Sequence, residues 1–353
     1  MAVIFSGTGS CIPQLVVDEK DFLNHSFYDE KGEKITEFNE RIIEKFKSIT
    51  GIEQRRYAAA NQVSSDLGTI AAIEALKDAG IAGEALSGII FAHNYGNIPL
   101  GSQQSDTVPS MASRVKHNLK IKDPSCITFD VMGGCPGWIQ SVSIAEKFIK
   151  NDPKQKYLVI GSETLSRVLD PHDRDSMIYG DGAGAVVLEN ANDNSGILSV
   201  AGKSFTGEEV AFLNFGSSFN KAHQPNIRYI KMRGRKIYEF ALTNVPLAMK
   251  ECLAQSGYDI DDLSKVLLHQ ANEKMDEAIL QRFYKLYHKK NVPPHVMPMS
   301  IHKLGNSSVA TVPTLLDLVL KNKMKGHSLK KGDIILMASV GAGMNINAIA
   351  YKM

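Results

Sequence analysis

The chain has 353 residues, 43% of them hydrophobic and 22% charged, a balance that excludes a disordered or fibrous protein. Its 40 Lys and Arg residues against 38 Asp and Glu give a formal net charge of +2, which excludes an overall field that attracts nucleic acid or an anionic membrane. The 4 cysteines show no CxxC pair or zinc-like Cys/His spacing, which excludes a disulfide scaffold and a cysteine-based metal site.

The N-terminus carries a short apolar run at residues 3–5 that no basic residue precedes. A signal peptide needs a basic start and a longer apolar run, and a membrane-spanning helix needs about 18 or more apolar residues in succession. Because the chain has neither, we expect a cytoplasmic protein that is not exported and does not span a membrane.

Two stretches of the chain share one pattern. A helix expected to end at Gly80 is followed by an apolar strand at 86–91, and a helix expected to end at Gly257 is followed by one at 263–268. A glycine at this place is typical of a helix C-terminus. Because the two stretches begin a similar series of elements, the pattern predicts an α/β protein that is built twice, with helices covering mixed sheets.

A polar turn at 190–196 is the weakest point between these repeats. We therefore expect two halves, residues 1–190 and 191–353. Two segments look inserted: a charged helical stretch at 29–47 and a polar loop at 94–123. Segments of this length serve as lids, partner surfaces or surface filler, and the sequence leaves these readings open.

Cys135 stands between an apolar strand and a helix, in the sequence Gly-Gly-Cys-Pro-Gly. Glycines permit a sharp turn, and Pro136 suits a helix start, so the sulfur is expected at the N-terminal end of a helix. Unpaired N–H groups and the helix dipole there favour the thiolate, which is the nucleophilic form. The alternative is a core cysteine, the interpretation given to Cys126 inside its apolar strand.

A thiolate that attacks an acyl group needs partners for protons and for the oxyanion, and the second half offers candidates. His269 ends an apolar strand where the chain turns. Asn306 precedes a helix, where the alternative role is an N-cap. The glycine loop at 339–343 also follows a strand, and its backbone N–H groups could point into a site.

Four motifs in this order resemble β-ketoacyl-ACP synthase III, a condensing enzyme of the thiolase superfamily. They are the segment around Cys135, Gly-Asp-Gly-Ala-Gly at 180–184, His-Gln-Ala-Asn from His269, and Gly-Asn-Ser-Ser at 305–308. The resemblance covers essentially the whole chain. It implies a five-layered αβαβα fold of two similar halves, and a homodimer.

The resemblance also implies roles for individual residues. Cys135 matches the acylated nucleophile, and His269 and Asn306 match the pair that holds the extender thioester during decarboxylation. The backbone N–H groups of Cys135 and Ala342 match a second oxyanion hole. The implied substrate-binding residues are Arg174, Asn272, Gly341 and Gly343.

Substrate delivery concerns a separate set of residues. Ile49 stands where the family often has an arginine for coenzyme A. Five basic residues fall within positions 228–236, and with Lys274 they suggest docking of an acidic acyl carrier protein, with Arg233, Arg235 and Lys274 as the candidates; the alternative is a solvated basic edge.

The expected function is therefore acyl transfer from a coenzyme A or carrier-protein thioester to Cys135, followed by decarboxylative condensation with a malonyl-type or β-ketoacyl thioester. No metal or redox cofactor is expected. One alternative is a related acyltransferase that passes the acyl group to an oxygen or nitrogen nucleophile. Another is a non-catalytic partner subunit, although such subunits usually lose the nucleophile.

Overall fold

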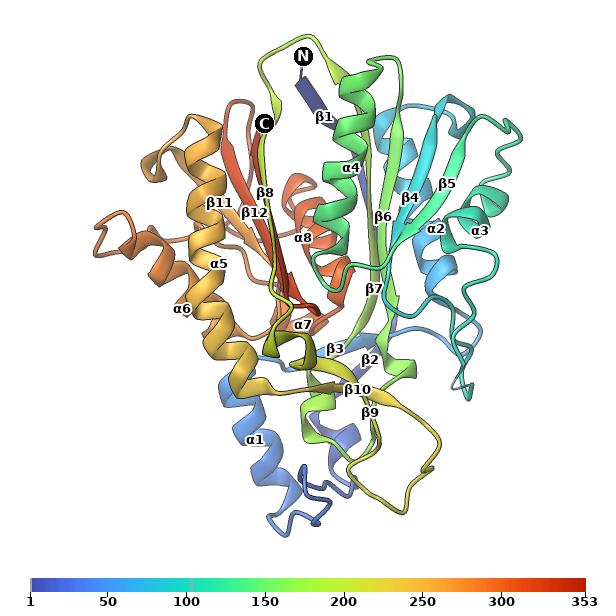
Figure 1. The fold of residues 1–353 in the computed structure, drawn as a ribbon, viewed down its shortest axis with the longest axis vertical. Helices are drawn as coiled ribbons and strands as arrows, with labels where there is room; N and C mark the ends of the chain where they lie inside the picture. The colour runs from blue at the N-terminus through green and yellow to red at the C-terminus, as the bar shows by residue number, and fades with distance from the viewer. Residues whose placement is uncertain (1, 103) are drawn as a thin grey trace.

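In the computed structural model, which describes residues 2–102 and 104–353, five strands of the first half form a mixed sheet in the order β1-β7-β6-β4-β5 (Figure 1). β4 is parallel to β5 and β6, whereas β7 is antiparallel to β6 and β1. The strands are β1 (Ala2–Cys11), β4 (Gly88–Ala92), β5 (Ile127–Val131), β6 (Tyr157–Thr164) and β7 (Asp181–Ala191).

A second sheet, in the order β11-β12-β13-β8, repeats the arrangement of the first. Its strands are β8 (Gly196–Ser204), β11 (Leu263–Leu268), β12 (Ile334–Gly341) and β13 (Asn345–Lys352). β11 and β12 are parallel, and β13 is antiparallel to β12 and β8. These directions match those of β4, β6, β7 and β1, so the predicted duplication is confirmed. The boundary predicted at 190 and 191 falls on the last residues of β7 and stays a prediction.

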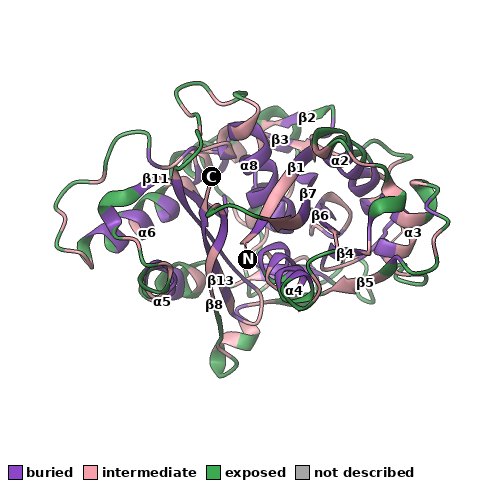
Figure 2. Ribbon diagram, turned by 90° about the horizontal axis from the view of Figure 1, so that it is seen from above, coloured by how far each residue is buried: buried purple, intermediate pink, exposed green. Residues whose placement is uncertain are grey.

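Helices lie in three layers around the two sheets (Figure 2). The layers are α2 (Ser64–Ala79) with α3 (Met111–Asn118), then α4 (Gly137–Asn151) with α8 (Thr311–Leu320), then α5 (Gly234–Ser256) with α6 (Glu273–Lys285). The middle pair packs between the sheets, because side chains of both helices share one buried cluster with residues of both sheets. The outer pairs pack against one sheet each. The predicted five-layered αβαβα order is therefore confirmed.

The helix ends follow from local sequence. Gly80 and Gly257 end α2 and α5 with φ of 67° and 79°, in the left-handed region that favours glycine. The apolar stripe of α4 is buried against both sheets and consists of Trp138, Val142, Ala145 and Ile149. This stripe holds the start of α4, and Cys135 just before it, at the centre of the molecule.

The two inserted segments differ from the prediction. The helix expected at 29–47 forms only as α1 (Asn39–Thr50). The stretch before it begins with a turn, because the Asp29 carboxylate accepts hydrogen bonds from the backbone N–H groups of Lys31 and Glu33. The loop expected at 94–123, of which residue 103 lies outside the described residues, contains α3. The N-cap residue Ser110 accepts one hydrogen bond at the start of α3, and Asp130 of β5, outside the segment, accepts two more from the backbone N–H groups of Met111 and Ala112.

Smaller elements surround one end of the sheets. They are β2 (Leu15–Asp18), β3 (Gln54–Tyr57), β9 (Leu213–Gly216), β10 (Tyr229–Met232) and α7 (Ile301–Leu304). β2 pairs with β3, and β9 pairs with β10. Within residues 2–102 and 104–353, no helix combines the length and apolar composition that crossing a membrane requires.

Candidate active site

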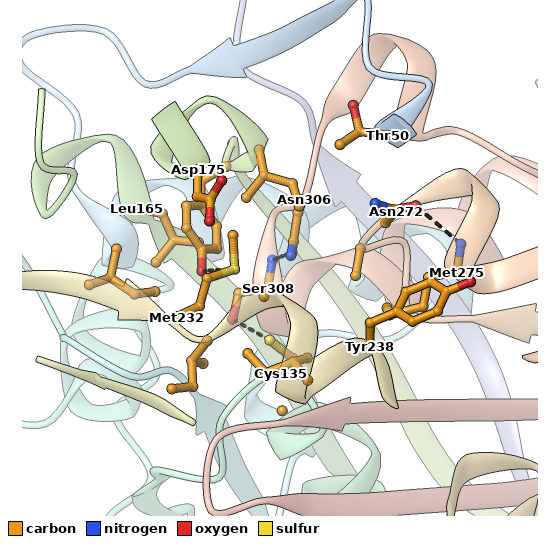
Figure 3. Close-up of a pocket in the computed structure, with 18 of the residues that line it drawn as sticks. Thr50, Cys135, Leu165, Asp175, Met232, Tyr238, Asn272, Met275, Asn306 and Ser308 are labelled. Carbon is orange, nitrogen blue, oxygen red and sulfur yellow. Dashed lines mark hydrogen bonds between the residues drawn. The ribbon is translucent and has the colours of Figure 1, made fainter. Parts of the chain in front are cut away.

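A cavity of about 590 Å³ collects most of the predicted site residues. Its lining includes the three predicted catalytic residues together with Arg174, Asn272, Gly341, Ala342 and Arg235. Figure 3 shows Cys135, Asn306 and Asn272 around it. Three other predicted residues, all in the described part of the chain, do not line it: Gly343, Arg233 and Lys274. The structure thus brings together residues that are up to 207 positions apart, from Cys135 to Ala342.

Cys135 occupies a tight turn between β5 and α4. A Cβ atom on Gly133 would lie 2.9 Å from the Cα of Gly137, and Gly134 has a φ of 65°, so both positions need glycine. Helix α4 begins two residues after Cys135, with Pro136 as its N-cap residue. The sulfur therefore stands at a helix N-terminus, as predicted, and faces the cavity.

The acidity of Cys135 differs from the expectation. Burial, with a smaller contribution from the nearby Glu163 carboxylate, raises the pKa of its thiol to about 11. The Ser308 hydroxyl, which donates a hydrogen bond to Sγ over 3.5 Å, lowers that pKa. With this pKa Cys135 is mainly a thiol at neutral pH, so the thiolate expected from the helix N-terminus is the minor form.

His269 lies at the end of β11 and is 4% exposed. Burial lowers the pKa of its imidazole to about 4, so the ring is neutral at pH 7. The backbone N–H of His269 donates to the Ala338 carbonyl on β12, which fixes the residue at the sheet edge. Among the described residues, Nδ1 has no hydrogen-bond partner. A neutral ring keeps one N–H donor and one acceptor for a substrate.

Asn306 is held by its backbone. Its N–H donates to the Ile178 carbonyl, and its own carbonyl accepts from Gly180, both over 2.9 Å. Its Oδ1 accepts the Ser308 backbone N–H at 2.8 Å, which leaves Nδ2 as a donor toward the cavity. Asn306 is not the N-cap of α8, because that helix begins at Thr311.

The glycine loop packs directly on the nucleophile turn. A Cβ atom on Gly134 would lie only 2.9 Å from the backbone nitrogen of Ala342, and Gly341 makes the reciprocal approach to Cys135. The backbone nitrogens of Cys135 and Ala342 therefore lie in neighbouring, tightly packed turns. Two such N–H groups are the kind of donor pair that stabilises an oxyanion.

Charged side chains surround the exposed part of the cavity. Arg174 and Arg235 line it, as do Lys45 and Asp175. Burial and the neighbouring Asp173 raise the pKa of the Asp175 carboxyl to about 6. Ile49, the position at which the resemblance would place an arginine for coenzyme A, also lines the cavity.

The basic run at 228–236 is not a continuous surface. Lys231 is buried, and its ammonium group pairs with the carboxylates of Asp170 and Asp173. Arg233, Arg235 and Lys274 are exposed, as docking residues must be.

Three residues near the nucleophile were missed in the sequence: Ser308, Asn94 and Glu163. Ser308 lies in the Gly-Asn-Ser-Ser motif, so its proximity to Asn306 was a usable signal. Asn94 opens the segment interpreted as a polar loop, and Glu163 lies in an otherwise buried strand. Glu163 is 0% exposed, and because that burial is known only from the structure, the sequence offered no signal for this residue.

Comparison with known proteins agrees with this geometry. The family profile "3-Oxoacyl-(acyl-carrier-protein) synthase III" matches residues 129–204, and its C-terminal counterpart matches 253–353. The β-ketoacyl-(acyl-carrier-protein) synthase III of Aquifex aeolicus is 32% identical over 98% of each chain. That of Caldanaerobacter subterraneus is 33% identical over 96% of this chain and 94% of the relative.

A crystal structure of the Aquifex aeolicus 3-oxoacyl-(acyl-carrier-protein) synthase III shares the fold, with a TM-score of 0.80 and 29% identity over 99% of this chain and 100% of that one. Similarity of sequence and of fold thus extends over nearly the full length, through all four motifs. The chain belongs to the 3-oxoacyl-(acyl-carrier-protein) synthase III family of condensing enzymes.

Proposed function

We propose that Cys135 takes an acyl group from a thioester and that the acyl-enzyme then condenses with a malonyl-type or β-ketoacyl thioester. The observation that carries this proposal is the single cavity that Cys135, His269 and Asn306 share with the backbone of Ala342. A nucleophile, two polar donors and a packed pair of backbone turns are the groups that both half-reactions need.

In the first half-reaction Sγ of Cys135 attacks the carbonyl carbon of the donor thioester. A bond forms between Sγ and that carbon, the bond from the carbon to the donor sulfur breaks, and the proton lost by Cys135 ends on the departing thiol. The carbonyl oxygen becomes negative on the way. The N–H groups of Cys135 and Ala342 stabilise this charge.

In the second half-reaction a malonyl thioester loses carbon dioxide, and the electrons of the broken carbon–carbon bond form an enolate. The neutral imidazole of His269 and Nδ2 of Asn306 donate hydrogen bonds to its oxygen. The enolate carbon then attacks the acyl carbon, the bond to Sγ breaks, and Cys135 takes up a proton from water. Neither step changes an oxidation state that would require a redox cofactor.

The acyl group is carried by coenzyme A or by an acyl carrier protein. Arg174 and Arg235 at the exposed part of the cavity suit the phosphates of either carrier. Arg233, Arg235 and Lys274 provide exposed positive charge for an acidic carrier protein. Gly341 and Asn272 line the cavity on the proposed route of the carrier arm to Cys135, and Gly343 lies two residues further along the glycine loop.

We further propose a homodimer that forms along β5. This strand is the edge of the first sheet, and Val108 and Met132 nearby are 84% and 74% exposed. An open edge flanked by apolar side chains favours pairing with a second copy of the same strand.

The test is intact mass spectrometry after incubation with a panel of acyl thioesters. We expect one added acyl group on the wild type and none on Cys135→Ala. Addition of a malonyl thioester should then release carbon dioxide and return the free enzyme. Acyl loading of Cys135→Ala at the native rate would contradict the proposal. Loading without carbon dioxide release would contradict a malonyl-type extender and would leave a β-ketoacyl thioester or an oxygen or nitrogen nucleophile as the acyl acceptor.

A further inference from the structure

A chain of hydrogen bonds leads from the nucleophile into the first sheet. Ser308 donates to Sγ of Cys135, as the dashed line in Figure 3 shows. Nδ2 of Asn94 donates to Ser308 Oγ at 3.0 Å and to Glu163 Oε2 at 2.7 Å. The residues come from three places in the fold: Ser308 from the turn before α8, Asn94 from the loop that follows β4, and Glu163 from β6. The half-reactions proposed above use none of the three.

The direction of each hydrogen bond follows from chemistry. An amide nitrogen only donates, and Glu163 is the acceptor that turns the Asn94 nitrogen, rather than its oxygen, toward this corner. The Asn94 backbone N–H also donates to Glu163 Oε2, at 2.8 Å. Because the Ser308 oxygen accepts from Asn94, its own hydrogen is free to point at Sγ. The network therefore makes Ser308 a donor to the sulfur.

The Ser308 backbone is held in an uncommon conformation. Its φ of 54° lies in the left-handed region, which costs a non-glycine residue about 1–2 kcal/mol. The Oδ1 of Asn306 holds this turn through the Ser308 N–H. A fold that places a serine here, where glycine would be less strained, indicates that the side chain has a use.

We propose that Ser308 stabilises the Cys135 thiolate through its hydroxyl group and that Asn94 is the residue that positions this hydroxyl. The inference rests on the proposed role of Cys135 as nucleophile. A hydrogen bond to a charged acceptor is stronger than one to a neutral acceptor, so the donor favours the thiolate over the thiol. It acts when Cys135 loses its proton before loading, and again when the thiolate leaves after condensation.

The other titratable groups near Sγ set the conditions for a test. They are Glu163, Tyr95, Tyr179 and His269. His93 faces Glu163 from the end of β4. Burial raises the pKa of Glu163 to about 7 and lowers that of His269 to about 4. Between pH 8.5 and 10 Glu163 is mainly ionised and His269 is neutral, so the thiolate fraction of Cys135 reports on Ser308.

The experiment measures the alkylation rate of Cys135 by iodoacetamide over this pH range, with peptide mapping to separate Cys135 from the other cysteines. Ser308→Ala should lower the rate about tenfold at each pH, as expected for one lost hydrogen bond to a charged sulfur. Ser308→Gly, which suits the positive φ, should do the same. The matched control is Ser307→Ala, because Ser307 is equally buried and its hydroxyl contacts Thr311 instead.

The positioning role is tested by a double-mutant cycle. Asn94→Ala alone should lower the alkylation rate about fivefold, the effect of a hydrogen bond of about 1 kcal/mol. In the Ser308→Ala background it should have no further effect, because Asn94 acts through Ser308. Equal rates for Ser308→Ala, Ser308→Gly and Ser307→Ala would overturn the proposal for Ser308. An additive loss in the double variant would overturn the role of Asn94. Alkylation needs no acyl substrate, so failure of the proposed condensation would not affect either result.

Discussion

Gly341 lies so close to Cys135 that a Cβ atom on Gly341 would be 2.6 Å from the Cys135 backbone nitrogen. Backbone atoms cannot yield as a flexible side chain can, so Gly341→Ala must push the glycine loop away from the nucleophile turn. We expect acyl loading of Cys135 to slow about a hundredfold, since one oxyanion donor is displaced. Quenched time courses analysed by intact mass spectrometry measure this rate.

The matched control is Gly182→Ala, because a Cβ atom there meets its nearest neighbours only at ordinary contact distances of 3.6–3.7 Å. It should load at nearly the native rate. If Gly341→Ala loads as fast as Gly182→Ala, the packing of the two turns has no part in catalysis.

His269→Ala and Asn306→Ala should separate the two half-reactions. Both side chains are proposed to hold the enolate oxygen, which arises only after loading. We expect loading to stay largely intact and condensation to slow by about two orders of magnitude for each lost donor. Single-turnover condensation from preloaded enzyme gives the rate directly. Normal condensation by either variant would remove that residue from the proposed mechanism.

The neutral state of His269 has a consequence for stability. Burial places its pKa at about 4, below the value of about 6.5 in an unfolded chain, so the unfolded state binds the proton more tightly. The stability that neutral His269 contributes is present above pH 6.5 and is lost as the pH falls toward 4. The shift corresponds to about 3 kcal/mol in the free energy of unfolding.

Urea unfolding of the wild type and of His269→Gln at pH 7 and pH 4.5 measures this loss. The wild type should lose stability over this range by about 2–3 kcal/mol more than the variant. Buried carboxyl groups such as Glu163 act in the opposite direction, but they are present in both proteins and cancel in the comparison. An equal loss in both proteins would show that His269 is not buried as a neutral ring.

The sequence predicted the positions of the proposed catalytic residues because each position is marked locally. Cys135 has its glycines, and His269 and Asn306 lie where a strand or helix visibly begins or ends. What it could not predict depends on distant partners. The start of α3 receives two further hydrogen bonds from Asp130 of β5, and the buried Lys231 pairs with Asp170 and Asp173. The high pKa of Cys135 comes from burial that only the folded chain creates.

If the homodimer forms along β5, charged substitutions at this edge should dissociate it. Met132→Lys and Val108→Asp would each place a charge beside the exposed edge. In a dimer that charge would lie close to its own copy or would be buried without a partner, and both are unfavourable. We expect either variant to elute as a monomer in size-exclusion chromatography with light scattering. The control is Leu247→Lys, because Leu247 is an exposed apolar residue on α5, in the other half of the molecule. This variant should leave the mass of the dimer unchanged. A monomeric wild type would contradict the proposal at once.

Docking of a carrier protein should depend on the starts of α5 and α6. Both helix starts line the cavity, through Arg235 on α5 and Met275 on α6, and the exposed Arg233 and Lys274 lie beside them. Reversing their charge with Arg233→Glu, Arg235→Glu and Lys274→Glu should weaken use of carrier-protein substrates mainly through the association rate. This loss should shrink as salt rises, because charges are screened over ~10 Å at about 0.1 M ionic strength.

Small thioesters that lack both a carrier protein and phosphate groups provide the internal comparison, since their approach needs neither the docking surface nor the phosphate-binding arginines. All three variants should use them nearly as well as the wild type does. Lys77→Glu on α2, in the outer helical layer of the other sheet, makes the same change of net charge and should affect neither substrate. If the three variants lose activity equally on both kinds of substrate, these side chains shape the cavity instead of docking a partner.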